Sequence, residues 1–438
     1  MKIFDTLSRK YKTIKNPQAN IYSCGPTIYD YIHIGNARPI LLTDTLIKFL
    51  EFKKVKVNFL QNITDIDDKI ISKSLETNTP EIELTNFFKK AYLKNLKELK
   101  VRMPNQIVCI SDEIKLMQSF IDNLIINQSA YETKSGIYFN INKFKSEYGK
   151  LSNIKVDDLI SKTAEDFFED KNLKADFSLW KTTNVGLNWD FHKQKGRPGW
   201  HTECVTLIDN YFNHETIDIH IGGIDLQFPH HENERIQFLA KNNKELSYIW
   251  MHNGHLTVDN VKMSKSLNNT THLKDFIQTY GVNVLRWLFQ TTHYKQPINI
   301  TDDLLKQGVK FEDKINNCIK KLKQWLIINE AKVEEQVDEH ILNKFDKYMN
   351  DDLNTPQVLM LINFLISNIN KEDNFKIKIL QFNTLKIILQ VLGFSFEFNL
   401  NVDDQIKMLY LKQKEHILNK EFVEADQIRA ILIKEGLL

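Results

Sequence analysis

The stretch "NIYSCGPTIYDYIHIGNARPILLTDTLIKFLEF", residues 20–52, indicates the fold, because it combines a strand, a glycine-containing turn and a helix. Its first residues, "NIYSCG", have the pattern of a short strand that Gly25-Pro26 ends. From His33 onward the apolar residues follow helical spacing, although Pro39 complicates the first turns of that helix. The stretch therefore predicts a strand that leads through a tight turn into a helix.

The same alternation continues further along the chain. "KVKVNFLQNIT", residues 54–64, has the pattern of a second strand, and "DIDDKIISKSL", residues 65–75, opens another helix. A strand pattern returns at "TIDIHIGGIDL", residues 216–226, and we expect a helix from Pro229. Strands that alternate with helices predict an α/β fold with a Rossmann-type, doubly wound parallel sheet.

Two regions depart from this pattern. Residues from about 105 to 195 suggest short strands and loops, and we interpret them as an inserted connective segment. After residue 302 the apolar residues mark a helical stripe, on which Cys318 falls as a packing residue. The sequence predicts a catalytic domain over 1–300, with a loop region at about 255–300, and an all-helical C-terminal domain over 301–438. The stripe consists of Phe311, Ile315, Ile319, Leu322 and Leu326.

The composition is that of an ordinary globular protein. The 438 residues include 58 basic and 56 acidic ones, which give a net charge of +2, so a surface that binds nucleic acid must be local. Four scattered cysteines do not form a disulfide framework at this length. The first residues are charged and no stretch approaches the roughly 18 apolar residues of a membrane span. We expect a reducing, cytoplasmic setting without a membrane partner.

Two short strings indicate a site for phosphate groups. In "HIGN", Gly35 would let a nucleotide approach the backbone at a helix start, while His33 and Asn36 could donate hydrogen bonds to phosphate oxygens. Read alone, this string is equally compatible with a helix cap. "KMSKS", residues 262–266, carries two lysines that suit phosphate, although a short basic run is usually a solvated loop.

Scattered thiols and a histidine cluster indicate a metal site. In "FPHHENE", residues 228–234, His230 and Glu234 are four apart and project from one helical face, although a capped, solvated helix start would have the same pattern. Together with Cys24 and Cys204 they form a four-ligand set of the kind that zinc accepts. From the residues alone, His231 is an equal candidate for the imidazole ligand.

Longer strings carry a resemblance to a known family. They resemble the cysteinyl-tRNA synthetase family of class I aminoacyl-tRNA synthetases over nearly the whole chain, and "HIGN" and "KMSKS" correspond to the two class motifs. The strings are "YSCGPTIYDYIHIGNAR" at 22–38, "NITDIDDKII" at 62–71, "GRPGWHTEC" at 196–204, "DIHIGGIDLQFPHHENE" at 218–234, "KMSKS" at 262–266 and "MNDDLNTPQ" at 349–357.

The resemblance implies an activity, partners and site residues. It implies ATP-dependent ligation of L-cysteine to its tRNA through a cysteinyl-adenylate, by a monomer with Mg²⁺ on the ATP and one zinc ion per chain that selects the thiolate. It favours His230 over His231 as the imidazole ligand. The implied residues are His33, Asn36, Lys262 and Lys265 for catalysis; His33, Gly35, Asn36 and Lys265 for ATP; Thr64, Trp200, His220 and Asp225 for the amino acid; and Cys24, Cys204, His230 and Glu234 for zinc.

Some features separate this chain from the family pattern, and two other functions compete. Ile221 stands where the family usually has glycine beside His220, and Asn268 stands where glycine is common after "KMSKSL". The sequence ends at "EGLL" where relatives usually continue into a Trp-containing tail, which bears on anticodon recognition. The alternatives are a related cysteine–amino-sugar ligase and a non-catalytic RNA-binding paralogue. The helical tail with "NDDLNTP" favours tRNA as the acceptor, and the intact motifs favour an enzyme.

Overall fold

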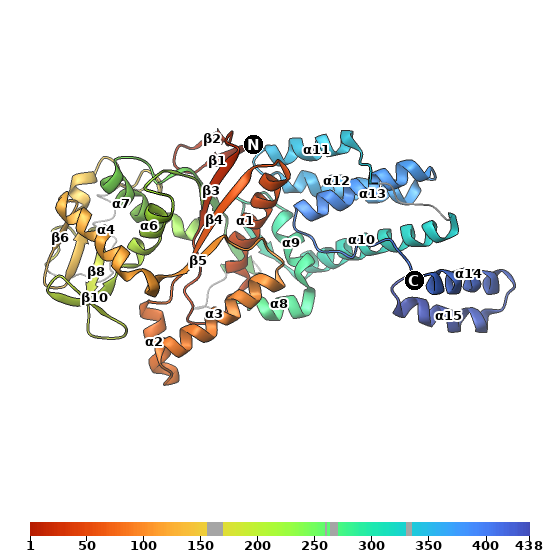
Figure 1. The fold of residues 1–438 in the computed structure, drawn as a ribbon, viewed down its shortest axis with the longest axis horizontal. Coiled ribbons are helices and arrows are strands. Elements are labelled where there is room, and N and C mark those ends of the chain that lie inside the picture. The colour runs from red at the N-terminus through yellow and green to blue at the C-terminus, as the bar shows by residue number, and fades with distance from the viewer. Residues whose placement is uncertain (156–169, 259–260, 263–269, 330–334) are drawn as a thin grey trace. The chain divides into compact units, whose positions relative to one another are not determined.

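The protein is described here by a computed structural model, shown in Figure 1, in which the chain forms two compact units. The first unit comprises Met1–Thr279, Thr292–Ile300 and Asn350–Leu353, and the second comprises Tyr280–Thr291, Thr301–Met349 and Asn354–Leu438. Within these units the structure describes residues 1–155, 170–258, 261–262, 270–329 and 335–438.

A five-stranded parallel sheet forms the base of the first unit, with the strand order β12-β11-β3-β4-β5. Strand β3 lies in the middle, and Ala19, Ile21 and Tyr22 on it are fully buried, as expected for a parallel strand covered on both faces. The chain adds β4 and β5 on one side of β3 and later adds β11 and β12 on the other. The strand order therefore reverses between β3 and β11, and ligands bind at such a reversal, beyond the carboxyl ends of the strands. The strands are β3 (Gln18–Ser23), β4 (Lys56–Ile63), β5 (Gln106–Cys109), β11 (Ile217–Gly223) and β12 (Ser247–Asn253).

Helices connect these strands as the sequence predicts. The helix expected from His33 is α1 (Ile34–Phe52), which contains Pro39 and packs against the sheet beside β4 in Figure 1. The next strand leads into α2 (Asp68–Thr77), at whose start the side chain of Asp67 accepts from the backbone N–H of Lys69, and then into α3 (Glu81–Glu98). The parallel sheet with helical connections confirms the predicted Rossmann-type fold.

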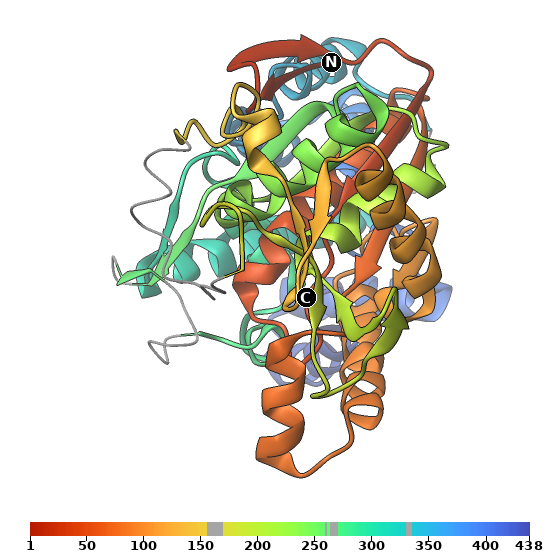
Figure 2. The same ribbon diagram turned by 90° about the vertical axis from the view of Figure 1, so that its left-hand side faces the viewer.

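The inserted segment contains a second, antiparallel sheet with the order β6-β7-β8-β10-β9, visible in Figure 2. Its start differs from the expectation of about residue 105, because β5 belongs to the parallel sheet and pairs with β4. Trp180 on β8 is fully buried in a core shared with Tyr22 and Leu60 of the parallel sheet. The insertion is thus packed onto the sheet. Its strands are β6 (Ala130–Glu132), β7 (Gly136–Phe139), β8 (Ser178–Thr182), β9 (Trp189–Phe191) and β10 (Gln194–Pro198), and α4 (Ile114–Ile126) precedes them.

The helix start expected at Pro229 lies directly after a kink at Phe228. The regular helix α7 (Glu232–Asn242) begins three residues later, and the irregular helical turn Gln227–His231 precedes it. Phe228 has extended backbone angles, φ −140° and ψ 134°, which interrupt the helical geometry before Pro229. The two histidines of this turn therefore come just before α7, while α6 (Trp200–Tyr211) packs against it.

The region after the parallel sheet forms a small third sheet, in which β13 (Leu256–Val258) pairs with β14 (Val261–Lys262) and with β15 (Ile298–Ile300). Helix α8 (Leu273–Tyr280) follows β14. Ile221, which stands where the family usually has glycine, lies within strand β11, where it is fully buried between Ser23 and Met251 of the neighbouring strands. Asn268 lies outside the described residues. Two short strands at the N-terminus, β1 (Lys2–Asp5) and β2 (Lys10–Thr13), form a hairpin.

The described part of the second unit is helical, which confirms the expected helical C-terminal region. The apolar stripe predicted from the sequence is the buried face of α10, and Cys318 on it is 1% exposed. Helices α14 and α15 form a hairpin, and its small core joins Tyr410 and Leu432 to Ile327 of α10. The helices are α9 (Val282–Gln290), α10 (Asp302–Asn329), α11 (Glu339–Asn350), α12 (Thr355–Lys371), α13 (Phe375–Val391), α14 (Asp404–Leu418) and α15 (Phe422–Lys434).

Hydropathy separates all of these helices from membrane-spanning ones. Among the residues that the structure describes, none of the helices combines the length and the apolar character needed to cross a bilayer.

The buried stripe of α10 predicts a stability difference between two isoleucines of the same helix. Ile315 is fully buried, whereas Ile328 is 57% exposed. Ile315→Ala should lower the free energy of unfolding by about 2–5 kcal/mol, because it leaves a cavity in a packed core. Ile328→Ala, the matched control, should change it by about 0.5 kcal/mol or less. Urea denaturation followed by far-UV circular dichroism measures both, and equal losses would show that the stripe is not the packed face.

Candidate active site and metal centre

A cavity of about 670 Å³ opens at the reversal of strand order in the first unit. Its walls come from the turn after β3, the first turns of α1, the start of α6 and the segment after β11. The structure thus brings together residues that lie up to 232 positions apart, Cys24 and Leu256 among them. Of the residues predicted for the site, the lining includes Cys24, His33, Gly35, Asn36, Thr64, Trp200, Cys204, Asp225 and His230.

Four of the predicted metal ligands converge on one point at the wall of this cavity. The Sγ atoms of Cys24 and Cys204 are 3.9 Å apart, and Cys204 Sγ is 3.6 Å from Nε2 of His230. Oε1 of Glu234 lies 2.8 Å from that same Nε2 and 3.8 Å from Cys24 Sγ. Tetrahedral zinc, with Zn–S near 2.3 Å and Zn–N near 2.0–2.1 Å, requires S···S of about 3.8 Å and S···N of about 3.6 Å. The spacing of the two thiols and the imidazole fits zinc. We call these four residues the outer set.

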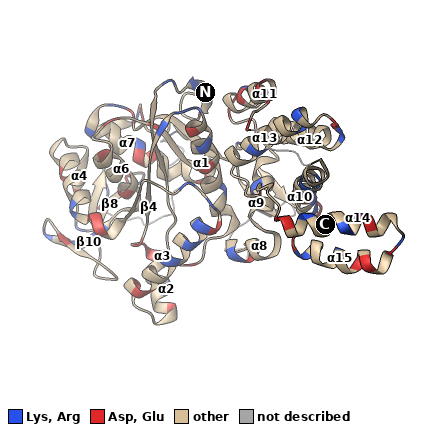
Figure 3. Cartoon of the chain, turned by 45° about the vertical axis from the view of Figure 1, so that its right-hand side comes forward, with Lys and Arg blue, Asp and Glu red and all other residues tan. Residues whose placement is uncertain are grey.

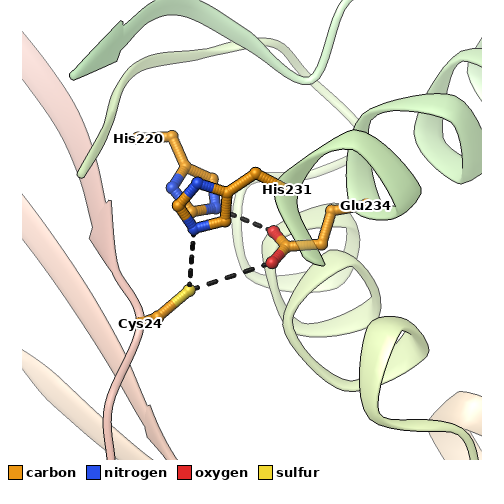
Figure 4. Close-up of side chains that lie close together, drawn as sticks. All are labelled: Cys24, His220, His231 and Glu234. Carbon is orange, nitrogen blue, oxygen red and sulfur yellow. Dashed lines mark hydrogen bonds and ion pairs between the residues drawn. The ribbon is translucent and has the colours of Figure 1, made fainter. Parts of the chain in front are cut away.

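A second group of possible ligands shares two residues with the outer set (Figure 4). Nε2 of His231 is 3.4 Å from Cys24 Sγ, and Nε2 of His220 is 2.8 Å from Oε2 of Glu234. The four ligand atoms of this group also lie within 4.8 Å of one another. We call Cys24, His220, His231 and Glu234 the inner set.

Access to the cavity distinguishes the two sets. Cys24, Cys204 and His230 line the cavity, whereas His220 and His231 do not and are fully buried. An ion on the outer set would therefore face the cavity, as a zinc ion that binds a substrate must. This geometry favours His230 over His231 as the imidazole ligand of an ion that meets substrate.

The ionisable side chains of the outer set shift one another's pKa values. Burial raises the pKa of the Cys204 thiol, but hydrogen bonds with Cys24 and His230 outweigh this and lower it to about 6. Burial lowers the pKa of His230, yet the Glu234 carboxylate and the Cys204 thiol raise it to about 10. For Cys24, burial and the neighbouring Cys204 both raise the thiol pKa. The imidazolium of His230 thus offsets only one of the two negative charges, those of one thiolate and one carboxylate, and a divalent cation that displaced the proton would offset more of them.

The predicted phosphate end lies at the start of α1. Asn36 accepts a hydrogen bond from the backbone N–H of His33 through Oδ1 at 3.1 Å, so it caps the helix and also lines the cavity. A Cβ on Gly35 would lie 2.8 Å from the imidazole of His33, so the glycine leaves room for that ring. The helix-cap interpretation of "HIGN" therefore describes this turn, which also lines the cavity, and its binding of phosphate stays a prediction.

The two lysines predicted to act on ATP are only partly covered by the structure. Lys262 ends strand β14, where it pairs with Thr257 of β13. Lys265 lies outside the described residues, as does the rest of "KMSKS" after Lys262.

The four residues predicted to surround the amino acid do not all reach the cavity. Thr64 and Asp225 line it, and Trp200 stacks on His230 with ring centroids 4.2 Å apart and an interplanar angle of 19°. His220 does not line it. Its ring lies behind Glu234 and stacks on Trp250, with centroids 4.6 Å apart.

Two buried residues that the sequence analysis did not name fix the position of Thr64. Its hydroxyl donates to Oε2 of Glu203 at 2.8 Å and accepts from Nδ2 of Asn62 at 3.1 Å. Oδ1 of Asn62 accepts from the backbone N–H of Gly25 at 2.7 Å and from the hydroxyl of Tyr22 at 3.0 Å. Asn62 therefore ties the turn that carries Cys24 to Thr64. The only sequence signal was a polar residue at the end of an apolar strand.

A buried arginine, also missed, connects α1 to the segment that leads into β13. The guanidinium of Arg38, 2% exposed, donates to the carbonyl oxygens of Gly254 at 2.6 Å, His255 at 2.9 Å, Tyr294 at 3.1 Å and Gln296 at 2.6 Å. Burial lowers the pKa of Arg38 to about 10. The signal in the sequence is a single arginine among the apolar residues of the helix.

Comparison with solved structures identifies the class of fold. Two structures of Mycobacterium tuberculosis methionyl-tRNA synthetase, with methionyl-adenylate bound, each align with 86% of this chain at a TM-score of 0.64, covering 89% and 90% of their own chains. At 14% and 13% identity these likenesses show the fold alone. Residues 10–310 match the family described as "tRNA synthetases class I (C) catalytic domain", and residues 344–397 match the DALR domain. The fold is that of a class I aminoacyl-tRNA synthetase.

Curated relatives narrow this class to one family. The chain is 54% identical to the cysteine–tRNA ligase of Mesoplasma florum over 441 residues, 51% to that of Mycoplasma mycoides subsp. mycoides and 39% to that of Malacoplasma penetrans. Each alignment covers 100% of both chains. This chain belongs to the cysteine–tRNA ligase family. The resemblance seen in the sequence is confirmed, and so is the prediction that the chain is an enzyme of this class.

The four carbonyl contacts of Arg38 predict a large effect of its removal. Arg38→Ala should lower the free energy of unfolding of the first unit by at least about 3 kcal/mol, because buried carbonyls lose a charged donor. Arg38→Lys should lose less, since its ammonium keeps the charge but lacks the planar fork. Arg429→Ala, whose side chain is 61% exposed, is the control and should change little. Guanidinium denaturation followed by tryptophan fluorescence measures the free energy of unfolding of all three variants. A similar loss in Arg38→Ala and Arg429→Ala would show that the contacts of Arg38 with the four carbonyl groups do not stabilise the fold.

Proposed function

We propose that this chain ligates L-cysteine to its tRNA through a cysteinyl-adenylate, and that a zinc ion on the outer set selects the thiolate of the amino acid. The observation that carries the proposal is the convergence of two thiols, an imidazole and a carboxylate at a cavity that also contains the "HIGN" turn. One end of the cavity suits sulfur and the other suits phosphate. Family membership supports the reaction.

The first step needs positioning and charge neutralisation more than covalent chemistry. A carboxylate oxygen of cysteine attacks the α-phosphorus of ATP, and pyrophosphate leaves with the bonding electrons. The backbone at the start of α1, with His33, Gly35 and Asn36, steadies the triphosphate. Lys262 and Lys265 add positive charge, and Mg²⁺ accompanies the phosphates.

In the second step a ribose hydroxyl at the end of the tRNA attacks the carbonyl carbon of the adenylate. AMP leaves, and the cysteinyl group is joined to the tRNA as an ester. We assign the binding of the tRNA to the helical domain over 301–438. We expect the protein to act as a monomer in the cytoplasm, because its four free cysteines stay reduced there. Both basic and acidic residues occur along these helices, including α14 and α15 in Figure 3, so we expect the tRNA contacts to be local.

The selection problem is the difference between sulfur and oxygen. A pocket that fits shape alone separates such near-isosteres by only roughly 1–3 kcal/mol. Zinc supplies a soft Lewis acid that binds thiolate far better than a hydroxyl, with Cys24, Cys204, His230 and Glu234 as its protein ligands. Around the rest of the amino acid we place Thr64, Trp200 and Asp225. His220, which lies behind Glu234, acts on the amino acid through that carboxylate.

The assignment of Lys265 to ATP predicts a selective loss of activity. Lys265→Ala should lower the rate of cysteine-dependent ATP–pyrophosphate exchange by about 10²-fold or more, because a charge that stabilises the transition state is lost. Its zinc content should not change, since no metal ligand is altered. Lys10→Ala, at an exposed position in β2, is the control and should exchange at the normal rate. An unchanged exchange rate in Lys265→Ala would refute the assignment.

The zinc assignment predicts what metal removal does to selectivity. The protein as isolated should contain one zinc per chain by mass spectrometry, and chelation should abolish the preference for cysteine over serine in pyrophosphate exchange, because the thiolate loses its ligand. Adding zinc should restore the preference. A zinc-free protein that still prefers cysteine by several orders of magnitude would overturn selection by metal. Aminoacylation of tRNA, compared with an amino-sugar acceptor, tests the acceptor separately.

A further inference from the structure

The outer and inner sets share Cys24 and Glu234. Each of these two side chains contacts the two sets on different sides or through different atoms. Cys24 Sγ lies 3.9 Å from Cys204 Sγ on one side and 3.4 Å from Nε2 of His231 on another. Glu234 directs Oε1 at His230 and Oε2 at His220, each at 2.8 Å (Figure 4 shows the inner side). A small movement of an ion between these two residues would exchange Cys204 and His230 for His220 and His231.

We propose that the inner set is a second, closed position for the zinc ion, which the ion occupies when Cys204 cannot bind it. The inference rests on the zinc site of the proposed function. It gives a role to His231, a residue that has none in the proposed reaction. Because both positions need Cys24 and Glu234, they hold one ion at a time. The ion on the inner set stays bound to the protein and does not meet the substrate.

A hydrogen-bond chain behind His231 supports this role. Nδ1 of His231 is 2.8 Å from Nε2 of His252, and Nδ1 of His252 is 2.9 Å from Oγ1 of Thr6. If each neutral imidazole carries its hydrogen on Nδ1, His231 donates to His252, which donates to Thr6. That arrangement leaves the Nε2 lone pair of His231 directed toward Cys24. Metal-binding histidines usually have such a partner on the second ring nitrogen, because it fixes the tautomer and the ring orientation.

The charge of the inner set suits a buried ion. One thiolate and one carboxylate with two neutral imidazoles leave no net charge around a divalent cation. The outer set has two thiolates and a carboxylate, so it keeps one net negative charge. His220, His231 and Glu234 are all fully buried, and a neutral centre costs less there than a charged one.

Two features explain why the outer position is preferred while Cys204 is intact. The outer set offers two thiolates, and zinc binds thiolate more strongly than imidazole. In addition, Nδ1 of His220 has no hydrogen-bond partner among the described residues. If Nε2 of His220 bound the ion, the hydrogen would move to Nδ1 and remain unpaired in the interior, at a cost. The inner set is therefore the weaker position, used in reserve.

The experiment measures zinc affinity in a double-mutant cycle. Zinc dissociation constants are obtained by competition with a chromophoric chelator for the full-length protein, His231→Asn, Cys204→Ala and the double variant. In the intact background, His231→Asn should weaken binding by about 10-fold, the lower end of the effect of an outer hydrogen-bond partner, because His231 contacts only Cys24 of the outer set. In the Cys204→Ala background it should weaken binding at least about 10-fold more than that, because a ligand is lost. Cys318→Ala, which removes a buried thiol elsewhere, is the matched control and should leave the affinity unchanged.

A spectrum of the cobalt-substituted protein provides a second readout. Cys204→Ala loaded with Co²⁺ should show thiolate-to-metal absorption from one thiolate with four-coordinate d–d bands, and His231→Asn should alter those bands only in that background. The Cys204→Ala protein should retain one metal per chain yet fail in pyrophosphate exchange. Equal effects of His231→Asn in both backgrounds, or a cobalt spectrum insensitive to His231, would overturn the inner position. Absence of zinc from the unmodified protein would instead refute the zinc site of the proposed function, so the two failures are distinguishable. If Cys204→Ala does not fold, Cys204→Ser carries the same test.

Discussion

The parallel pairing of β3 with β11 is the constraint on which the site depends. Ser23, the last residue of β3, is paired with Ile221, so Cys24 leaves the sheet beside the turn that leads to His230 and α7. These residues are about 200 positions apart in the chain, and only the register of the two strands brings them together. A slip of one residue would turn every side chain of β3 to the opposite face and separate the thiol from its partners.

The same reversal of strand order also connects the two ends of the cavity, one beside the thiols and the other at the start of α1. The turn after β3 carries Cys24 and leads, ten residues later, to the start of α1, so the proposed sulfur-binding end and the proposed phosphate-binding end belong to one continuous segment. Asn62 holds the first part of this segment through the backbone of Gly25, and Arg38 holds α1 to the chain that leads into β13. Because each contact is buried and directional, the distance between the two ends is set by the fold itself.

The sequence predicted the parts of this arrangement that depend on local pattern. Alternating strands and helices predicted the parallel sheet, and residue types with metal-binding chemistry predicted that Cys24 and Glu234 would meet. The residues alone did not separate His230 from His231, which only the family resemblance did, because neighbours in sequence differ in which wall of the site they reach. His220 was expected at the amino acid but lies behind Glu234, since burial of a strand residue depends on what packs against it. Arg38 was missed because its partners are 216 or more residues away.

The burial of so many ionisable groups also links the stability of the fold to metal. Glu234 is fully buried between two imidazoles, and a buried carboxylate must be compensated. In the metal-free protein a proton on His230 supplies part of this compensation, which is why the pKa of that histidine rises to about 10. A divalent cation on the outer set would replace the proton and bind only the folded arrangement, so its binding free energy would add to the free energy of unfolding. The proposed metal ligands therefore destabilise the centre of the first unit on their own, and a bound cation would offset this cost.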